Sequence, residues 1–193
     1  MDARSSRSDG QVAHLKETLL QRSEIYSGRL LSFFRDEVRL ADGGSAAREV
    51  VEHPGAVAVV ATDSEGKVVL VRQWRHAVGR ALWEIPAGTS EPDEEARATA
   101  ERELREETGF AARRWRRMAA APVSPGYSSE LVTFFLAEDL VAGEARTDAD
   151  EAVEVARFTP GDVAGMASRD EVDIKTVAGL ALAGLFTTAI RDV

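Results

Sequence analysis

Stretches of alternating apolar and polar residues, and short runs of apolar residues, dominate the first half of this chain. Such stretches predict β-strands, and the glycines and acids between them predict turns. We expect a short helix in residues 13–22 and then strands at 25–30, 33–40, 48–53, 56–61, 68–75 and 82–85. Because Ala41-Asp42-Gly43-Gly44 is typical of a hairpin turn, the first strands predict an antiparallel N-terminal sheet.

The second half begins with helical spacing. Ala96, Ala100 and Leu104 recur at every fourth position and mark one face of a helix. Further strands are expected at 116–121, 131–137 and 153–158, a short helix from Thr159-Pro160, and a longer helix over 173–190. This order of elements is compatible with an α/β/α sandwich around a mixed sheet.

Composition narrows the function classes. The chain has 193 residues and 44% apolar residues, enough for one domain with a sizeable core and an extension. A net charge of −9 with no visible basic face argues against nucleic acid as a partner. Cysteine is absent, which excludes disulfides and thiol chemistry. Since no apolar stretch approaches the length of a membrane helix or secretory signal, we expect a cytoplasmic protein with no membrane partner.

Three glutamates on the predicted helix place like charges close together, an arrangement that destabilises a helix. Glu103 and Glu107 are four residues apart and Glu106 lies beside them, so like charges crowd one side of the helix. A divalent cation would turn this repulsion into binding, because Mg²⁺ and Mn²⁺ prefer oxygen ligands. Taken alone, three glutamates would also suit a solvated acidic helix.

The spacing of the residues around these glutamates favours the functional interpretation. Gly88 is followed after five residues by Glu94 and, after seven more, by the run Arg102-Glu103-Leu104-Arg105-Glu106-Glu107-Thr108-Gly109-Phe110. This stretch resembles the Nudix box, the loop–helix–loop motif of the Nudix hydrolases, at every fixed position. The resemblance implies a Nudix α/β/α sandwich and metal-assisted hydrolysis of a diphosphate linked to a nucleoside.

Three stretches outside the box resemble the ADP-ribose pyrophosphatase subgroup. They are Glu52-His53-Pro54-Gly55-Ala56-Val57, then Val71-Arg72-Gln73-Trp74-Arg75 with Trp83-Glu84-Ile85-Pro86-Ala87-Gly88, and finally Ser124-Pro125-Gly126-Tyr127. The resemblance implies cleavage of ADP-ribose to AMP and ribose 5-phosphate. It also implies that Arg75 and Glu84 contact the substrate, together with Pro125, Gly126 and Tyr127.

The resemblance further implies roles for the residues of the box. Glu103 and Glu107 would hold Mg²⁺ or Mn²⁺, with Glu106 and the Ala87 carbonyl as further ligands. Arg102 would orient the glutamates by hydrogen bonding to them without contacting the metal, as outer partners of metal ligands do.

The general base is expected after the box. In ADP-ribose enzymes of this family it tends to come from a mobile loop, and residues 147–152 hold three acids ahead of a predicted strand. Glu151 is the candidate, Asp150 and Glu154 are the alternatives, and Glu106 follows if none of them acts. A solvated acidic loop would have the same composition.

The subgroup exchanges its N-terminal sheet between two subunits, which implies a homodimer with shared sites. We therefore expect a flexible extension over 1–22, an N-terminal β-sheet region for dimerisation and substrate contact over 23–53, and a Nudix hydrolase domain over 54–193. Two alternatives stay open: hydrolysis of another nucleoside diphosphate sugar or a dinucleotide, and a non-catalytic sensor of ADP-ribose. The complete set of box carboxylates argues against the sensor.

Overall fold

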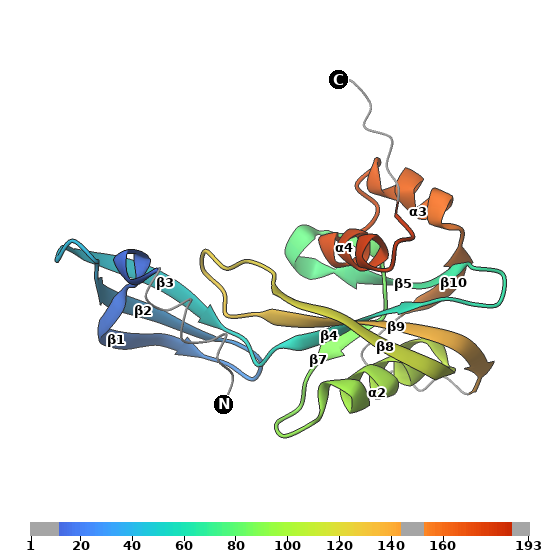
Figure 1. Ribbon diagram of the computed structural model, residues 1–193, viewed down its shortest axis with the longest axis horizontal. Helices are drawn as coiled ribbons and strands as arrows, with labels where there is room; N and C mark the ends of the chain where they lie inside the picture. Colours follow the sequence, from blue (N-terminus) through green and yellow to red (C-terminus); the bar gives the residue numbers. More distant parts are fainter. Residues whose placement is uncertain (1–11, 144–152, 187–193) are drawn as a thin grey trace. The chain divides into compact units, whose positions relative to one another are not determined.

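The computed structural model describes residues 12–143 and 153–186, and these form two compact units (Figure 1). One unit consists of residues 12–54 together with Pro122–Glu130. The other consists of Gly55–Ala121 with residues 131–143 and 153–186. Residues 122–130, which fall within the range 54–193 expected for the Nudix hydrolase domain, have backbone bonds to the first unit: the Val51 amide donates to the Tyr127 carbonyl, and the Ser129 amide donates to the Val51 carbonyl.

An antiparallel sheet forms most of the first unit. Its strands are β1 (Thr18–Ser27), β2 (Ser32–Arg39) and β3 (Ser45–Glu52), in the order β1-β2-β3, preceded by the 3₁₀ turn η1 (Ala13–Leu15). The helix predicted over 13–22 is therefore wrong beyond η1, and the sheet begins before the expected boundary at residue 23. Pairing with β2, from Thr18 opposite Arg39 onward, outweighs the weak helical preference of this segment.

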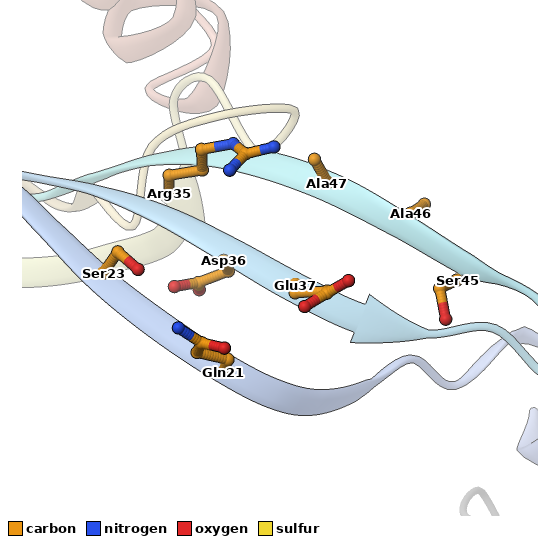
Figure 2. Close-up of a pocket in the computed structure, with 8 residues that line it drawn as sticks. All are labelled: Gln21, Ser23, Arg35, Asp36, Glu37, Ser45, Ala46 and Ala47. Atoms are coloured by element: carbon orange, nitrogen blue, oxygen red, sulfur yellow. The ribbon is translucent and has the colours of Figure 1, made fainter.

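A polar hollow of about 310 Å³ lies over this sheet (Figure 2). It is lined by Gln21, Ser23, Arg35, Asp36, Glu37, Ser45, Ala46 and Ala47. Asp36 is buried and accepts hydrogen bonds of 2.8 and 2.7 Å from Arg22, which lowers the pKa of that carboxyl. Since Arg22 already neutralises the buried acid and ties β1 to β2, we assign no ligand to the hollow.

Two further sheets build the second unit. The first has the order β7-β4-β9-β8 and comprises β4 (Ala56–Ala61), β7 (Ala87–Thr89), β8 (Phe110–Pro122) and β9 (Leu131–Ala142). It is mixed, because β4 runs antiparallel to β7 and parallel to β9. The second is antiparallel, with the order β10-β5-β6, and comprises β5 (Val68–Arg75), β6 (Arg80–Glu84) and β10 (Glu154–Phe158), with the 3₁₀ turn η2 (His76–Val78) between β5 and β6.

Within residues 12–143 and 153–186, the α-helices beside these sheets are α2 (Ala96–Thr108), α3 (Pro160–Ala167) and α4 (Ile174–Leu182). The long helix predicted to run to residue 190 ends at Leu182, and Gly184 then adopts a left-handed φ of 73°. The last part of that prediction, from residue 187, lies outside the described residues. No helix in the described part of the chain is long and apolar enough to cross a membrane.

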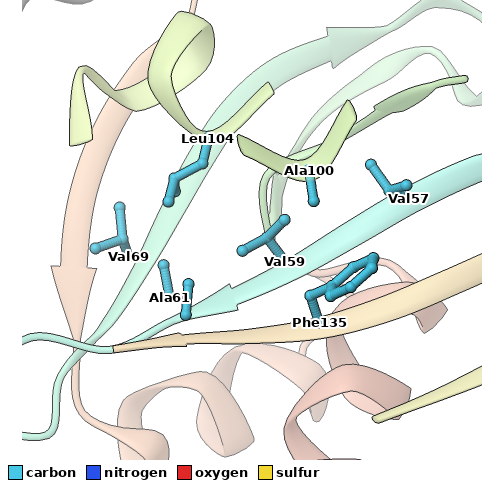
Figure 3. Close-up of a cluster of buried hydrophobic side chains, with 8 residues drawn as sticks. Val57, Val59, Ala61, Val69, Ala100, Leu104 and Phe135 are labelled. Carbon is cyan, nitrogen blue, oxygen red and sulfur yellow. The ribbon is translucent and has the colours of Figure 1, made fainter. Parts of the chain in front are cut away.

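The core between α2 and the mixed sheet fixes the orientation of the box helix. Ala100 and Leu104 of α2 are buried against Val57 and Val59 of β4 and Phe135 of β9 (Figure 3). Burying a side chain such as Leu104 contributes about 1.5–3 kcal/mol, so this face of α2 must turn inward. The spacing of residues 96, 100 and 104 predicted this face.

The opposite face of the mixed sheet is covered by α4. Alternate residues of a strand point to opposite faces, and Val60 of β4 approaches Gly179 of α4, whereas Val57 and Val59 face α2. Helices therefore lie on both sides of β4, as Figure 1 shows. The predicted α/β/α layering around a mixed sheet is confirmed.

Candidate active site

Arg102 lies at the centre of the acidic cluster on α2. Its guanidinium donates to Glu94 at 3.2 and 3.0 Å, to Glu103 at 2.7 Å and to Glu106 at 3.1 Å. These hydrogen bonds hold the pKa of Glu94 at about 2, and the carboxylates raise the pKa of Arg102. A single cation thus holds three carboxylates in place, which is the geometry that the predicted role of Arg102 needs.

Strand β7 lies close to α2 at position 88, where glycine leaves room for the end of the Glu103 side chain. A Cβ on Gly88 would lie 2.0 Å from Cδ of Glu103. One residue earlier, the Ala87 amide donates to the carboxylate of Glu107 at 3.1 Å. The Ala87-Gly88 backbone and the Glu103 and Glu107 carboxylates therefore meet at one place, while the Glu106 side chain is more exposed.

The donor set at this place suits a hard divalent cation. Glu103, Glu106 and Glu107 supply carboxylate oxygens from one helix, and such oxygens are the ligands that Mg²⁺ and Mn²⁺ prefer. Within residues 12–143 and 153–186, no three acidic or histidine side chains converge as a complete metal cage. Mg²⁺ rarely needs one, because it keeps several waters and binds through one or two carboxylates plus substrate phosphates. The residues present therefore fit the ion, and their assignment as ligands stays a prediction.

Arg75 and Glu84, both predicted to contact the substrate, pair with each other. Nε and Nη2 of Arg75 each lie 2.6 Å from an oxygen of Glu84. The Glu84 side chain is only 1% exposed, whereas that of Arg75 is 39% exposed. The bidentate pair raises the pKa of Arg75 and fixes its guanidinium on the surface of the sheet.

Two residues that the sequence analysis did not single out complete this pair. Nζ of Lys175 lies 3.5 Å from Oε2 of Glu84 and also pairs with Asp173, the residue that caps α4. Asp173 is the first residue of the helix predicted over 173–190, and an aspartate at that position is typical of a helix cap. Nothing in the sequence indicated that this helix begins beside Glu84.

The roles of the remaining predicted residues stay predictions. Pro125, Gly126 and Tyr127 belong to the first unit, and the Tyr127 side chain is exposed. Of the candidate bases, Asp150 and Glu151 lie outside the described residues. Glu154 begins β10 and pairs with Arg72 at 3.6 Å.

Comparisons with known proteins identify the family of this chain. Residues 52–178 match the model of the NUDIX domain. The chain is 42% identical over 165 residues to the ADP-ribose pyrophosphatase of Bacillus subtilis (strain 168), covering 84% of this chain and 89% of that protein. It is 38% identical over 146 residues to the methanol dehydrogenase activator of Bacillus methanolicus, covering 75% of this chain and 79% of that protein. A crystal structure of an ADP compounds hydrolase has the same fold, with a TM-score of 0.76 at 22% identity, and covers 88% of this chain and 92% of that chain.

The layered fold and the match to the NUDIX domain model define the class of this protein. The chain belongs to the Nudix family and is a Nudix hydrolase. Enzymes of this family generally depend on divalent metal ions, in agreement with the carboxylate donors on α2.

Proposed function

We propose that this Nudix hydrolase cleaves the diphosphate of ADP-ribose to AMP and ribose 5-phosphate. One observation supports the proposal: the carboxylates of Glu103 and Glu107 lie against the backbone of the Ala87-Gly88 strand. There they would bind a cation beside the diphosphate of the substrate. The choice of substrate is supported by the 42% identity to an ADP-ribose pyrophosphatase over most of both chains.

The residues of the box would bind Mg²⁺ or Mn²⁺ through Glu103 and Glu107, with Glu106 and the Ala87 carbonyl as further ligands. When bound, the ion supplies charge neutralisation and Lewis acidity at the diphosphate. Arg102 donates hydrogen bonds to Glu103 and Glu106 and would hold their carboxylates in position.

The substrate is held by other groups of the chain. Arg75, oriented by Glu84, offers a guanidinium to the diphosphate or the ribose. Pro125, Gly126 and Tyr127 are proposed as further substrate contacts, on the resemblance to the ADP-ribose pyrophosphatase subgroup.

We assign the general base to Glu151, with Asp150 as the nearest alternative. Glu154 is the weaker candidate because it already has an ion-pair partner in Arg72. Glu151→Gln should lower kcat strongly and leave KM within a few-fold, since a base acts mainly in the transition state. Asp150→Asn and Glu154→Gln are the controls, and a larger loss in either would show that the base is a different acid.

We also propose a homodimer built through the N-terminal sheet. Leu19, Leu20, Ile25 and Tyr26 of β1 are all exposed, and so much apolar surface on one strand is typical of an interface. Light scattering should return about twice 20.9 kDa, and Ile25→Asp should shift the equilibrium toward the monomer. A wild-type monomer at micromolar concentration with full activity would contradict the shared-site dimer.

A Mg²⁺-dependent hydrolysis screen with product identification tests the proposed activity. ADP-ribose, GDP-mannose and NADH separate the substrate classes, and a second relative with a different name makes such a comparison necessary. Fastest turnover of ADP-ribose with release of AMP is the expected result. Preference for another compound would replace the substrate, and tight binding of ADP-ribose without turnover would indicate a sensor.

A further inference from the structure

The N-terminal turn of α4 is bonded to the segment that leads into the active-site strand. The Ile85 amide donates to the Thr176 hydroxyl at 2.9 Å in a buried position, and that hydroxyl donates to Asp173 at 2.6 Å. At the next turn Gly179 lets α4 come close, since a Cβ there would lie 2.7 Å from Cδ1 of Ile85. The start of α4 is therefore held against residues 84 and 85, which precede the Ala87-Gly88 strand.

Lys175 uses this placement to reach Glu84. Its side chain is 22% exposed, and Nζ lies between the carboxylates of Asp173 and Glu84. Burial lowers the pKa of Lys175, but Asp173 and Glu84 outweigh that effect and raise it overall. Lys175 is therefore a cation fixed against the buried carboxylate.

Glu84 thus has two cationic partners, and this affects what Arg75 can do. Arg75 uses Nε and Nη2 on Glu84, and within residues 12–143 and 153–186 its Nη1 makes no hydrogen bond. Without Lys175, the buried charge of Glu84 would be compensated by Arg75 alone, and a buried charge needs a close partner, so the guanidinium would be held more strongly on Glu84. A second cation on the same carboxylate relieves that pull.

We infer that Lys175 is a positioning residue that shares the charge of Glu84 and thereby leaves Nη1 of Arg75 directed toward the diphosphate of the substrate. This inference rests on the proposed function, in which Arg75 contacts the substrate. Lys175 itself does not contact the reacting atoms. Asp173 and Thr176 place it by fixing the first turn of α4.

Steady-state kinetics with ADP-ribose at saturating Mg²⁺ test the inference with Lys175→Met, which keeps most of the stem and removes the charge. KM should rise about tenfold while kcat stays within about threefold of wild type. The reason is that the weakened contact binds the substrate equally in the ground state and in the transition state. Lys175→Arg restores the cation and should return KM to within about threefold of wild type. Lys67→Met is the matched control, because Lys67 also pairs with a glutamate but does so in an exposed turn, and its kinetics should equal those of wild type.

A purely structural role would give a different result. It would lower the melting temperature and the active fraction of Lys175→Met and leave KM unchanged, and this outcome would overturn the inference. If Lys175→Met does not fold, Lys175→Gln can still donate to Asp173 and should show the same rise in KM.

A second background tests whether Lys175 acts through Arg75. Arg75→Lys keeps a cation on Glu84 and lacks the planar fork, so adding Lys175→Met to it should change KM by no more than about twofold. A further tenfold rise would mean that Lys175 contacts the substrate directly, contrary to the inference. A wild-type protein without ADP-ribose turnover would refute the proposed function, whereas an active wild type with unchanged KM in Lys175→Met would refute this inference alone.

Discussion

Replacing Gly88 by alanine should abolish catalysis while leaving the protein folded. The added Cβ would lie 2.0 Å from Cδ of Glu103 and 2.1 and 2.5 Å from its two oxygens. Gly88 does not have a left-handed φ, so alanine is compatible with the backbone at this position. The single consequence of the substitution is therefore a forced movement of the Glu103 carboxylate.

The size of that movement sets the expected loss. Ordinary contact with a Cβ begins at 3.4 Å, so Cδ of Glu103 must retreat by at least the difference from 2.0 Å. A misplacement of about 1 Å at a reacting centre can cost about a hundredfold in rate, so kcat should fall by at least that factor. Stability should change by less than about 1 kcal/mol, because the group that moves is the end of a flexible side chain.

Hydrolysis rates at saturating Mg²⁺, measured beside urea unfolding of the same samples, test this prediction. Gly161→Ala in the first turn of α3 is the matched control, since the nearest atom to its new Cβ is 3.8 Å away. The control should keep full activity and gain up to about 1 kcal/mol from helix propensity. The reasoning fails if Gly88→Ala keeps kcat within about threefold of wild type, or if its loss of activity is matched by unfolding.

Three other predictions concern the box and the core. Arg102 holds the pKa of Glu94 at about 2, below the ordinary 4.5, so its stabilising effect is complete above pH 4.5 and is lost as the pH falls toward 2. Glu94→Gln should flatten the dependence of the free energy of unfolding on pH in that window, and an unchanged slope would contradict this assignment. Glu107→Gln should lower kcat about a hundredfold or more, with stability without metal equal or higher because a like-charge repulsion is removed, and near-normal kcat would exclude Glu107 as a ligand. Gly179→Ala should lower the free energy of unfolding by about 1–3 kcal/mol, because the added methyl group overpacks against Ile85. Equilibrium unfolding in urea measures this change, and an unchanged free energy of unfolding would contradict the prediction.

The sequence by itself determined the local elements of the Nudix unit and the motif on which its chemistry depends. Strands β4 and β5 have the bounds predicted for them, because each is a short apolar run between turn residues. The inward face of α2 followed from the spacing of Ala100 and Leu104, since a helical period is a property of neighbouring residues. The same period placed Glu103 and Glu107 on a common side of the helix.

Tertiary structure alone decided the contacts between distant segments. Thr18–Ser27 became a strand because β2 pairs with it, and residues 122–130 joined the first unit through backbone bonds to β3. Lys175 lies 91 positions from Glu84, and no periodic pattern links two residues so far apart. Which cation neutralises a buried carboxylate depends on how helices pack against a sheet, and that packing results from the whole core and not from any one segment.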